Sequence, residues 1–550
     1  MPELLHEIGQ RLALDGGNLY RARAYTRAAE TLAGLIEPLQ DVIASGQLRD
    51  LPGIGAAIAA IIPTLHETGT HPMLEALRAD VPASVLPMLS VPGLKPEKVL
   101  ALYRQLGIRS VPELEDAARS GALDGAKGFG PAFARKVLAG IEAVRTAQGR
   151  RHMHRAAELL EDAARRLREA MPGLQEVAVA GDLRRGCELV GDMALVATMR
   201  GVAETVRTGE ITLHLIDPAK RGITLLLATG SDAHLTQLRQ LADEQGYRLD
   251  AHGLATDDRI LAKTENEIYA GLGMPFIAPE LREGAGEIEL ALGHDLPKLV
   301  TETDLRGILH AHTTQSDGAD TLEDMAEAVR QRGYGYLGIS DHSQSAHYAG
   351  GLKLREIETQ HAAIDRLNAG YDGAFRILKG IESDIREDGA LDYPDEILAR
   401  FDFVVASVHS KFRLDEAAQT ARIVRAVANP FTTILGHMTG RQLLRRLGYE
   451  VDIEQVLHAC ARHAVAVEIN ANPWRLDLDW RWHRRALELG CTMSINPDAH
   501  STEEIDLVRW GVAMARKGAV PKSRVLNCLD LPHLDRWLQT RRRRTIDPAG

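Results

Sequence analysis

The sequence is short of the features that mark secreted, membrane-bound and generally nucleic-acid-binding proteins. Its 550 residues include only 4 cysteines, and none of them forms a CxxC pair. This excludes a zinc ribbon or a disulfide framework and predicts a reduced, cytoplasmic protein. No apolar leader and no run of about 18 apolar residues is present, which predicts no membrane partner. The formal net charge of −11 excludes a uniformly basic surface, so any nucleic-acid site must be local.

What the sequence does contain is enough apolar material for several folded domains. Hydrophobic residues make up 45% and charged residues 26%, as in globular proteins. Apolar periodicity, with glycine and proline between segments, divides the chain. The predicted limits are 1–85, 86–148, 149–235, 236–298 and 305–540. We expect the first two segments to be helical, the next two to be α+β, and the last to alternate strands with helices.

Three glycine-containing turns separate predicted helices within 1–148. They are Leu51-Pro52-Gly53-Ile54-Gly55, Val91-Pro92-Gly93-Leu94 and Lys127-Gly128-Phe129-Gly130-Pro131. Glycines let the amides of a turn approach a phosphate, and the N-terminus of the following helix favours the anion. Three ordinary interhelical turns are the alternative, but the repetition favours helix-hairpin-helix motifs that hold a DNA backbone. The expected contacts are Gly53, Gly55, Gly93, Lys95, Lys98, Gly128 and Gly130.

Seven apolar strand candidates alternate with helical segments after residue 305. They are 307–312, 336–340, 376–381, 403–408, 432–435, 464–469 and 492–495. Such alternation implies parallel pairing, and seven units favour a β/α barrel, with an open sheet as the alternative. In a barrel of this kind the active site lies at the C-terminal ends of the strands.

Histidines and acids recur at these predicted strand ends. In His310-Ala311-His312 the two imidazoles are expected on one face, because side chains alternate along a strand. The full set is His310, His312 and Asp317 after the first strand, Asp341 and His342 after the second, Glu382 after the third, His409 after the fourth, His437 after the fifth, and Asp498 and His500 after the seventh. A set spread over six strand ends predicts a multinuclear metal site, and its mixed ligands suit Mn²⁺, Fe²⁺ or Zn²⁺.

A glycine- and arginine-rich segment in the third domain carries a family resemblance. Gly181-Asp182-Leu183-Arg184-Arg185-Gly186, followed by Gly191-Asp192, resembles the nucleotidyl-transfer motif of the family X DNA polymerases. Thr229-Gly230-Ser231 and the segment 267–283 agree with it. The resemblance covers essentially the whole chain, because bacterial members carry a C-terminal PHP phosphoesterase domain. It implies a helical N-terminal half, an α+β palm and thumb, and a distorted seven-stranded α/β barrel.

The sequence departs from that family where the polymerase holds its Mg²⁺ ions. The family uses three aspartates, but this chain has only Asp192, with Ala194 in the second position and Thr212 in the third. Asp182 replaces a phosphate-contacting serine, whereas Arg185 matches. Two-metal phosphoryl transfer depends on carboxylates around both ions. We therefore expect a folded palm that holds Mg²⁺ poorly and polymerises weakly or not at all.

The resemblance to PHP domains, by contrast, leaves no ligand position unfilled. It implies one ion on His310, His312, Glu382 and Asp498, a second on Glu382, His409 and His437, and a third on Asp317, His342 and His500. Mn²⁺ is the family's preferred ion, with Zn²⁺ or Fe²⁺ as alternatives. The expected catalytic core is His310, His312, Glu382, His409 and Asp498, while Asp341 is expected to be structural. Lys411, Arg441 and Arg475 match phosphate-binding positions.

Together these patterns predict a DNA-repair enzyme that hydrolyses phosphate esters at DNA ends, chiefly as a 3′→5′ exonuclease. Gapped, nicked or 3′-recessed DNA is the expected partner, and no pattern predicts an oligomeric state. The alternatives are an active gap-filling polymerase with a PHP exonuclease, a histidinol-phosphate-type phosphatase, and a non-enzymatic DNA-binding scaffold. The tail Arg541–Arg544 is interpreted as a frayed, solvated end, with nucleic-acid contact as the alternative.

Overall fold

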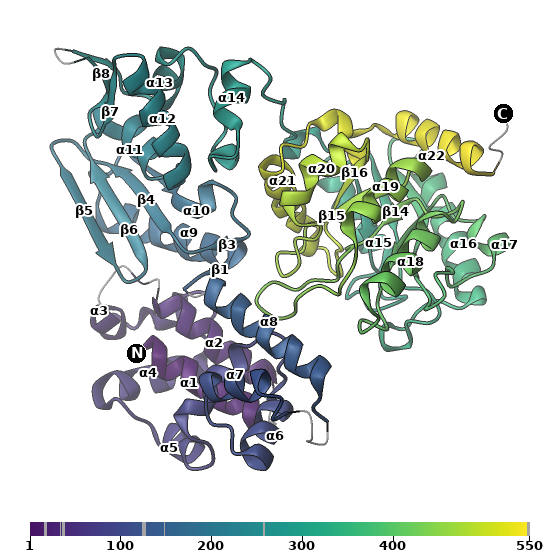
Figure 1. The fold of residues 1–550 in the computed structure, drawn as a ribbon, viewed down its shortest axis with the longest axis horizontal. Coiled ribbons are helices and arrows are strands. Elements are labelled where there is room, and N and C mark those ends of the chain that lie inside the picture. Colours follow the sequence, from purple (N-terminus) through teal and green to yellow (C-terminus); the bar gives the residue numbers. More distant parts are fainter. Residues whose placement is uncertain are drawn as a thin grey trace. The chain divides into compact units, whose positions relative to one another are not determined.

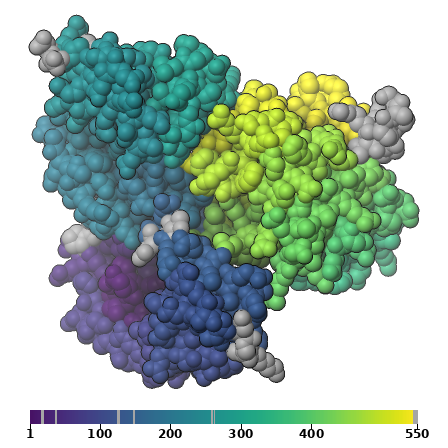
Figure 2. Space-filling view, viewed as in Figure 1, coloured from purple at the N-terminus to yellow at the C-terminus, as the bar shows by residue number. Residues whose placement is uncertain are grey.

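The computed structural model describes residues 1–546 except 16–18, 34, 36–38, 124–127, 148 and 257–258. The chain folds as two compact units (Figures 1 and 2), the first formed by Met1–His294 with Leu444–Leu447 and the second by Asp295–Leu443 with Gly448–Gly550. The five domain limits expected from the sequence stay a prediction. Over the described part of the chain, no helix combines the length and the apolarity that crossing a membrane requires.

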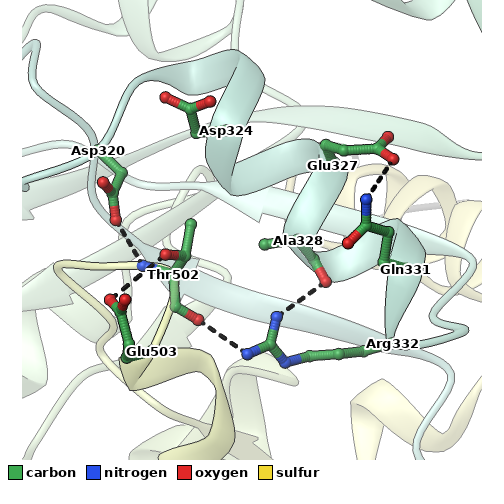
Figure 3. Close-up of a pocket in the computed structure, with 8 residues that line it drawn as sticks. All are labelled: Asp320, Asp324, Glu327, Ala328, Gln331, Arg332, Thr502 and Glu503. Atoms are coloured by element: carbon green, nitrogen blue, oxygen red, sulfur yellow. Dashed lines mark hydrogen bonds between the residues drawn. The ribbon is translucent and has the colours of Figure 1, made fainter.

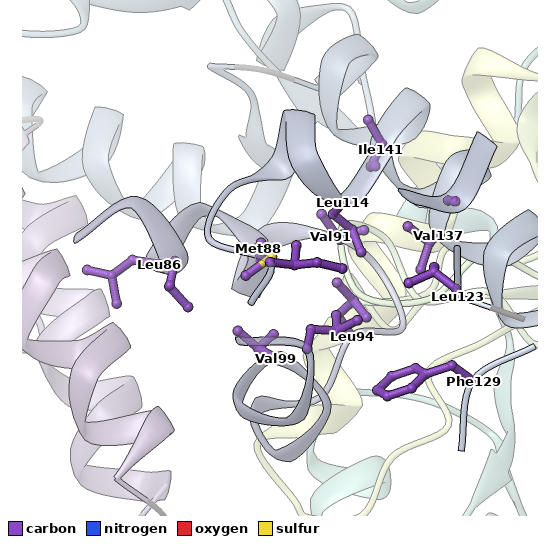
Figure 4. Packing of buried hydrophobic residues seen from close by; sticks show 14 of the residues in the cluster. Leu86, Met88, Val91, Leu94, Val99, Leu114, Leu123, Phe129, Val137 and Ile141 are labelled. Carbon is purple, nitrogen blue, oxygen red and sulfur yellow. The ribbon is translucent and has the colours of Figure 1, made fainter. Parts of the chain in front are cut away.

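The first unit begins with helices, as expected. They are α1 (Pro2–Leu14), α2 (Leu19–Ala33), α3 (Leu39–Ala44), α4 (Ala56–Thr68), α5 (Pro72–Arg78), α6 (Pro96–Leu106), α7 (Val111–Arg119) and α8 (Pro131–Ala147), with the short turns η1 (Gln47–Asp50) and η2 (Ala83–Ser90). They enclose two apolar clusters. One includes the fully buried Leu5 and Ile62, and the other, shown in Figure 4, joins Met88, Val99 and Leu114. Burial of these side chains is what holds helices of this length together.

A four-stranded sheet follows in the order β2-β4-β6-β5. Its strands are β2 (Glu176–Ala180), β4 (Met193–Thr198), β5 (Ala203–Thr208) and β6 (Ile211–Ile216), and the small strands β1 (Arg151–His152) and β3 (Leu189–Val190) pair beside it. Helix α9 (Met153–Ala170) precedes the sheet, and α10 (Gly181–Arg184) begins where β2 ends. Strands β4 and β6 are parallel, whereas the other neighbours in the sheet are antiparallel.

The rest of the first unit is a small mixed region of helices and short strands. Its elements are η3 (Pro218–Lys220), α11 (Arg221–Leu227), α12 (Asp232–Glu244), β7 (Arg248–Asp250), β8 (Gly253–Ala255), β9 (Ile260–Ala262), α13 (Glu265–Gly271), η4 (Pro279–Leu281) and α14 (Glu287–Leu292). Three of its helices meet at His234, which is fully buried and lies 2.6 Å from Glu287 and 2.9 Å from the hydroxyl of Tyr269. A buried polar side chain with partners on both ring nitrogens fixes how these helices pack.

The second unit contains a seven-stranded parallel sheet in sequential order. Its strands are β10 (Gly307–Ala311), β11 (Tyr336–Ile339), β12 (Arg376–Asp384), β13 (Phe403–Ser407), β14 (Ile434–Leu435), β15 (Ala466–Asn470) and β16 (Met493–Asn496). The first and last strands meet through a parallel bridge between Ala311 and Ala499, where the His312 amide donates to the Ala499 carbonyl at 2.8 Å. The sheet therefore nearly closes into a barrel, which confirms the favoured topology over the open sheet.

Helices and short 3₁₀ turns precede, connect and follow the strands of this barrel. They are η5 (Glu302–Asp304), α15 (Leu322–Gln331), η6 (His347–Ala349), α16 (Leu354–Gly370), α17 (Asp395–Leu398), α18 (Glu416–Val427), α19 (Ile453–His463), η7 (Trp480–Trp482), α20 (His483–Glu488), η8 (Glu504–Leu507), α21 (Val508–Lys517), η9 (Lys522–Arg524), η10 (Leu526–Cys528) and α22 (Leu531–Ile546). Tyr336, Phe403 and Leu534 of α22 belong to one buried cluster. Glycine at 307 and at 380 makes room for these rings, because a Cβ there would lie 2.1 Å from Tyr336 and 2.3 Å from Phe403.

The C-terminal arginines correct one expectation. Helix α22 continues through them to Ile546, so the segment is not frayed. Arg541 is only 3% exposed and donates to the Pro430 carbonyl at 3.0 Å, and Arg542 donates to the carbonyl of Phe401. The carbonyl groups at the ends of neighbouring elements take up these guanidiniums, so the run is partly structural. The side chains of Arg543 and Arg544 lie outside the described residues.

Candidate metal centre

The end of β10 brings its two histidines to one point through an irregular backbone. The register against β11 shifts between Ile308 and Ala311, and His310 has a φ of 63°. The two imidazoles meet as expected, but an irregular backbone brings them together and not the simple alternation of side chains along a strand. His310 Nε2 and His312 Nε2 lie 3.3 Å and 3.1 Å from the same oxygen, Asp498 Oδ1. Asp498 is also left-handed, with a φ of 54°. Left-handed backbone at two non-glycine residues is strained and is typical of functional sites.

Glu382, at the centre of the site, faces imidazoles with both oxygens. Its Oε1 lies 3.1 Å from His437 Nε2 and 3.3 Å from the Nε2 atoms of His310 and His409. Its Oε2 lies 2.9 Å from His342 Nδ1. The Glu382 side chain is 1% exposed, so a buried carboxylate is surrounded by nitrogen ligands from four other strand ends. A carboxylate in this position can bridge two ions, because each of its oxygens can bind a different one.

Asp317 gathers the remaining ligands on the more open side. Its Oδ1 lies 3.4 Å from His500 Nε2, 3.6 Å from His342 Nε2 and 3.8 Å from His312 Nδ1. Asp317 and His500 are about one-third exposed, whereas His310 and His312 are fully buried. The structure thus brings all nine expected ligands together. The side of the cluster that Asp317 forms is the one open to solvent.

The ligand atoms fall into three groups, each with its atoms within 4.8 Å of one another. The groups are His310 with His312 and Asp498, His342 with Glu382 and His409, and His312 with Asp317, His342 and His500. All three differ from the implied assignment. The first lacks Glu382, the second has His342 where His437 was expected, and the third also includes His312. His437 belongs to none of the groups but lies 3.1 Å from Glu382 Oε1. Which ligand holds which ion stays a prediction.

The expected ligands suit divalent ions for two reasons. Their atoms have the right spacing, and some of their buried nitrogens lack a hydrogen-bond partner in the described part of the chain. Two ligand atoms each about 2.1 Å from one ion lie about 3–4 Å apart, which matches the separations around Glu382, Asp498 and Asp317. His310 Nε2 and His312 Nδ1 are buried yet make no well-aligned hydrogen bond to another described residue. Buried polar atoms are rarely left so. A site for several metal ions satisfies both observations, and this mixed ligand set does not select between Mn²⁺, Fe²⁺ and Zn²⁺.

Two further carboxylates, which the sequence analysis did not single out, orient the ligands from behind. Glu468 Oε1 lies 2.6 Å from His310 Nδ1, and its Oε2 accepts from the His437 amide at 2.7 Å. Asp384 Oδ1 lies 2.6 Å from His409 Nδ1. Such contacts fix the tautomer and ring orientation of a ligating histidine. A signal for both was present, since Glu468 interrupts an apolar strand and Asp384 shares a strand face with Glu382.

Asp341, at the end of β11, has the structural role expected for it. Its two oxygens accept from the Thr313 amide at 2.7 Å, the Thr313 hydroxyl at 2.8 Å and Gln360 at 2.6 Å. Burial raises the pKa of the Asp341 carboxyl, and these donors act against that rise. The residue therefore ties the loop after β10 to β11 and α16 and does not face the cluster.

Electrostatics around the cluster favour protons on some imidazoles when no ion is bound. Burial lowers the pKa of His409, but Glu382 and Asp384 outweigh it and raise the pKa to about 10. For His500 burial is likewise outweighed, chiefly by Asp317, and the pKa is raised to about 9. His312 differs, because burial lowers its pKa to about 3. Positive histidines in turn hold the pKa of the buried Glu382 well below its ordinary value.

The three expected phosphate-binding residues differ in how far their charges are already paired within the protein. Lys411 is exposed, has a φ of 58°, and pairs with Glu387 at 3.0 Å. Arg475 reaches to 3.9 Å from Asp498 Oδ2. Arg441 is bound within its own surroundings, because it pairs with Asp479 at 2.6 Å and donates to the Arg475 carbonyl at 3.1 Å. The structure thus gives Arg441 the role of holding the loop that carries Arg475.

A polar pocket of about 400 Å³ lies behind the loops of Asp317 and His500 (Figure 3). It is lined by Asp320, Asp324, Glu327, Ala328, Gln331, Arg332, Thr502 and Glu503. Arg332 donates to the Ala328 and Thr502 carbonyls at 3.0 and 3.1 Å, and Asp320 accepts from the Thr502 amide at 2.7 Å. These bonds join the two loops, so the residues that line the pocket hold the open side of the metal cluster in place.

The palm sheet places the two missing carboxylate positions side by side. Ala194 and Thr212 are direct partners in the parallel pair of β4 and β6, which agrees with the position counted for the third aspartate. Asp182 accepts from the amides of Gly191 and Asp192 at 2.8 and 2.9 Å. It therefore anchors the turn that carries Asp192.

Arg185, the matching phosphate contact of the palm, is already surrounded by acceptors. It pairs with Asp182, lies 3.1 Å from Glu283, and donates to the Thr229 carbonyl at 2.7 Å. Two carboxylates beside it oppose the approach of a triphosphate by like-charge repulsion.

The three expected hairpins have the turn geometry that the sequence predicted. Gly53, Gly93 and Gly128 have φ values of 77°, 84° and 89°, and helices α4, α6 and α8 follow them. Gly55 is the N-cap of α4 and Lys95 that of α6. Gly130 precedes α8, whereas Lys127 lies outside the described residues.

Two expected DNA contacts are already hydrogen-bonded within the protein. The Gly93 amide donates to the Arg445 carbonyl at 2.9 Å. Lys98 Nζ donates to the Gly128 carbonyl at 3.0 Å and lies 4.9 Å from the centre of the Phe129 ring. Lys136 of α8 lies against Gly93 in turn. The second and third hairpins are therefore packed against each other through their lysines.

Comparison with known proteins gives three matching family models and several relatives. The models are the DNA polymerase beta thumb over residues 224–283, a helix-hairpin-helix domain over 2–71 and the PHP domain over 309–472. The chain is 33% identical over 566 residues to the DNA polymerase/3′-5′ exonuclease PolX of Bacillus subtilis (strain 168). The aligned region covers 98% of this chain and 98% of that protein. A probable phosphatase of Thermoanaerobacter sp. (strain X514) is 27% identical over 264 residues, 45% of this chain and 97% of that protein. A probable phosphatase of Vibrio parahaemolyticus is 28% identical over 232 residues, 40% and 87% of the two chains.

Proposed function

Because the chain belongs to the bacterial type of family X DNA polymerase that carries a PHP domain, we propose that it acts mainly as a metal-dependent phosphoesterase on DNA ends. The expected reaction is the 3′→5′ removal of nucleotides. One observation carries the proposal, namely the convergence of nine ligands from six strand ends on one partly open cluster. The name of the Bacillus subtilis relative, which includes a 3′-5′ exonuclease, supports it.

The chain's own residues would orient a phosphodiester at the open side of the cluster. Divalent ions bound there would supply Lewis-acid stabilisation of the phosphate and a nucleophilic water near neutral pH. Arg475, beside Asp498, would hold a phosphate oxygen, and the exposed Lys411 would attract a neighbouring phosphate. Glu468 and Asp384 would keep His310 and His409 aimed at the cluster.

We further propose that the palm polymerises weakly or not at all. Ala194 and Thr212 support this, since each occupies a position where a carboxylate would hold Mg²⁺. The network of Asp182, Arg185 and Glu283 supports it as well, because it engages the arginine that would meet the incoming phosphates. The palm would then help to position the DNA without extending it.

DNA with gapped, nicked or 3′-recessed ends is the proposed substrate, and the hairpins are the proposed contacts. Amides at turns with left-handed glycines and at helix N-termini suit phosphate oxygens of any sequence. The match of residues 2–71 to a helix-hairpin-helix model supports this binding mode.

A second candidate is the hydrolysis of a small phosphomonoester. The similarity to two probable phosphatases over 40% or more of this chain favours keeping it under test.

The deciding assay offers both classes of substrate to the purified full-length protein. A 5′-labelled, 3′-recessed duplex and histidinol phosphate are incubated separately with Mn²⁺, beside the variant His310→Ala and the control His458→Ala. His458 lies on the exposed side of α19, so its variant is expected to behave as the wild type. Shortening of the duplex that is lost only in His310→Ala is the predicted result. Cleavage of histidinol phosphate with the duplex untouched would overturn the proposal.

A further inference from the structure

An exposed tyrosine stands at the mouth of the metal cluster and has no role in holding it. Tyr348 lies on η6, in the loop that follows β11 and His342. It is 71% exposed, whereas Ala346 and Ala349 on either side of it are 0% and 2% exposed. A large aromatic side chain exposed to solvent between two buried alanines adds little to the core, and its face is open to a bound molecule.

The ring lies beside the cluster. Its centre is 6.2 Å from that of the His342 imidazole, with the two planes at 57°. Partial burial, followed by the charges of Asp384, Glu382 and Asp317, raises the pKa of the Tyr348 phenol, so the ring stays neutral at physiological pH.

The loop that carries Tyr348 is fixed at both ends. The Ser343 amide donates to the Glu382 carbonyl at 3.0 Å, and the Leu352 amide donates to the His342 carbonyl at 2.8 Å. Between them the Ser345 amide donates to Asp392 at 2.7 Å. These bonds hold the backbone that carries the ring, and this lowers the conformational entropy that the loop loses when a base binds.

We propose that Tyr348 is the stacking platform for the base of the terminal nucleotide whose phosphodiester lies at the metal cluster. This inference rests on the proposed function and adds a binding contact to it. An aromatic face stacks on any base, so the contact would favour nucleotides over other phosphate esters without reading their sequence. It would also favour an unpaired terminal base, because a base within a duplex is already stacked.

The test compares two single-stranded DNA substrates that differ only at the 3′ terminus. One ends in thymidine, and the other ends in a tetrahydrofuran nucleotide, which has no base. Wild type, Tyr348→Ala, Tyr348→Phe and Leu354→Ala are measured with Mn²⁺. Leu354 is the control, because it is an exposed apolar residue at the start of α16 close to the same loop. Equal metal content and thermal midpoints establish that the four proteins are comparable.

Tyr348→Ala is expected to raise KM for the thymidine end by about tenfold and to leave KM for the baseless end unchanged. Tyr348→Phe keeps the aromatic face and is expected to match the wild type on both. A second readout needs no hydrolysis. A 3′-terminal 2-aminopurine joined through a hydrolysis-resistant phosphorothioate is expected to lose fluorescence on binding to the wild type with Mn²⁺ and to lose less on binding to Tyr348→Ala.

Three outcomes would overturn the inference alone while hydrolysis by the wild type persists. They are equal KM values for all four proteins, equal losses on both ends in Tyr348→Ala, and a Tyr348→Phe variant as impaired as the alanine variant. If the wild type shortens neither DNA, the proposed function fails, and the 2-aminopurine signal then decides the stacking contact separately. An absent or tyrosine-independent signal would overturn it.

Discussion

The palm and the barrel both present side chains from neighbouring parallel strands, but they differ in how those side chains are satisfied. In the palm, the positions for two carboxylates hold Ala194 and Thr212, and the charged residues nearby pair with one another. In the barrel, His310 Nε2 and His312 Nδ1 are buried and have no aligned hydrogen-bond partner among the described residues. Charged groups that pair with one another need no ion. Buried ring nitrogens without a hydrogen-bond partner, by contrast, need an ion to bind them.

The comparison teaches that the palm sheet can pack without the aspartates that the family resemblance led us to expect. The palm sheet stays packed without its aspartates because Ala194 is itself buried in a small apolar cluster with Ala180 and Val196. The barrel lacks that freedom, because its ligands lie inside the fold, where unpaired charge is costly. The catalytic prediction therefore follows the side chains of each site and not the name of the family.

The largest expected effect comes from Glu382→Gln. Glutamine has the shape of glutamate but offers one oxygen and an NH₂ donor, which would face the imidazoles that surround Glu382. Retained metal is expected to fall, and DNA hydrolysis to drop by about 10³-fold or more. Metal content after gel filtration, measured by mass spectrometry, checks the first effect, and duplex shortening checks the second.

The matched control for that change is Glu358→Gln on the exposed face of α16, where the carboxylate pairs only with Arg400 at 3.3 Å. It is expected to keep full metal and activity. If Glu382→Gln retained both instead, the centre described here would not be the source of hydrolysis.

A smaller effect is expected from Glu468→Gln, which leaves every expected ligand in place but weakens the contacts that hold two of them. Glu468 is fully buried between His310 and the His437 amide, so its loss disorients the His310 imidazole and loosens the backbone that carries His437. Metal affinity should fall by about 10- to 100-fold, with kcat recovered at high Mn²⁺. Competition with a fluorescent chelator measures the affinity. An unchanged metal affinity would mean that Glu468 only packs beside the site and does not orient its ligands.

The pH dependence of metal binding sharpens the contrast further. In the ion-free protein the pKa values of His409 and His500 are raised to about 10 and about 9, so both side chains carry protons at pH 7. An ion needs the neutral imidazole, so binding releases protons and the apparent affinity rises between pH 6 and 9.

The same shifts also affect the stability of the ion-free protein. Their contribution to stability is complete below about pH 6.5 and is lost as the pH rises through 9–10. Calorimetric Mn²⁺ titrations in buffers of different ionisation enthalpy count the protons released. A pH-independent affinity with no proton release would contradict this account.

The smallest expected effect distinguishes two lysines of the hairpins. Lys95 is exposed, so Lys95→Ala should weaken duplex binding a few-fold and reduce the slope of log affinity against log salt by about 1. Lys98 is bound to the Gly128 carbonyl, so Lys98→Ala should leave that slope nearly unchanged. Fluorescence anisotropy over a salt series measures both. Equal slope changes would mean that Lys98 leaves its carbonyl for DNA.

Much of the barrel could be predicted, because hydrophobic runs and strand-end polar residues are local patterns. All seven strands form where the sequence placed them, and the nine ligands converge. The bulge at His310 could not be predicted, since its left-handed φ depends on closure of the barrel against Ala499. The partners of Arg441, Lys98 and Arg541 were missed for another reason. A sequence shows that a side chain is charged, but the neighbours that take up its charge come from distant segments.

We expect the barrel to hydrolyse DNA ends and the palm to extend them poorly. The most direct measurement follows one labelled primer on a one-nucleotide gap with Mn²⁺ and all four dNTPs, and compares wild type, His310→Ala and Asp192→Asn. Shortening in the wild type and in Asp192→Asn, with an unchanged primer in His310→Ala, is the predicted result. Efficient extension by the wild type that Asp192→Asn abolishes would contradict it.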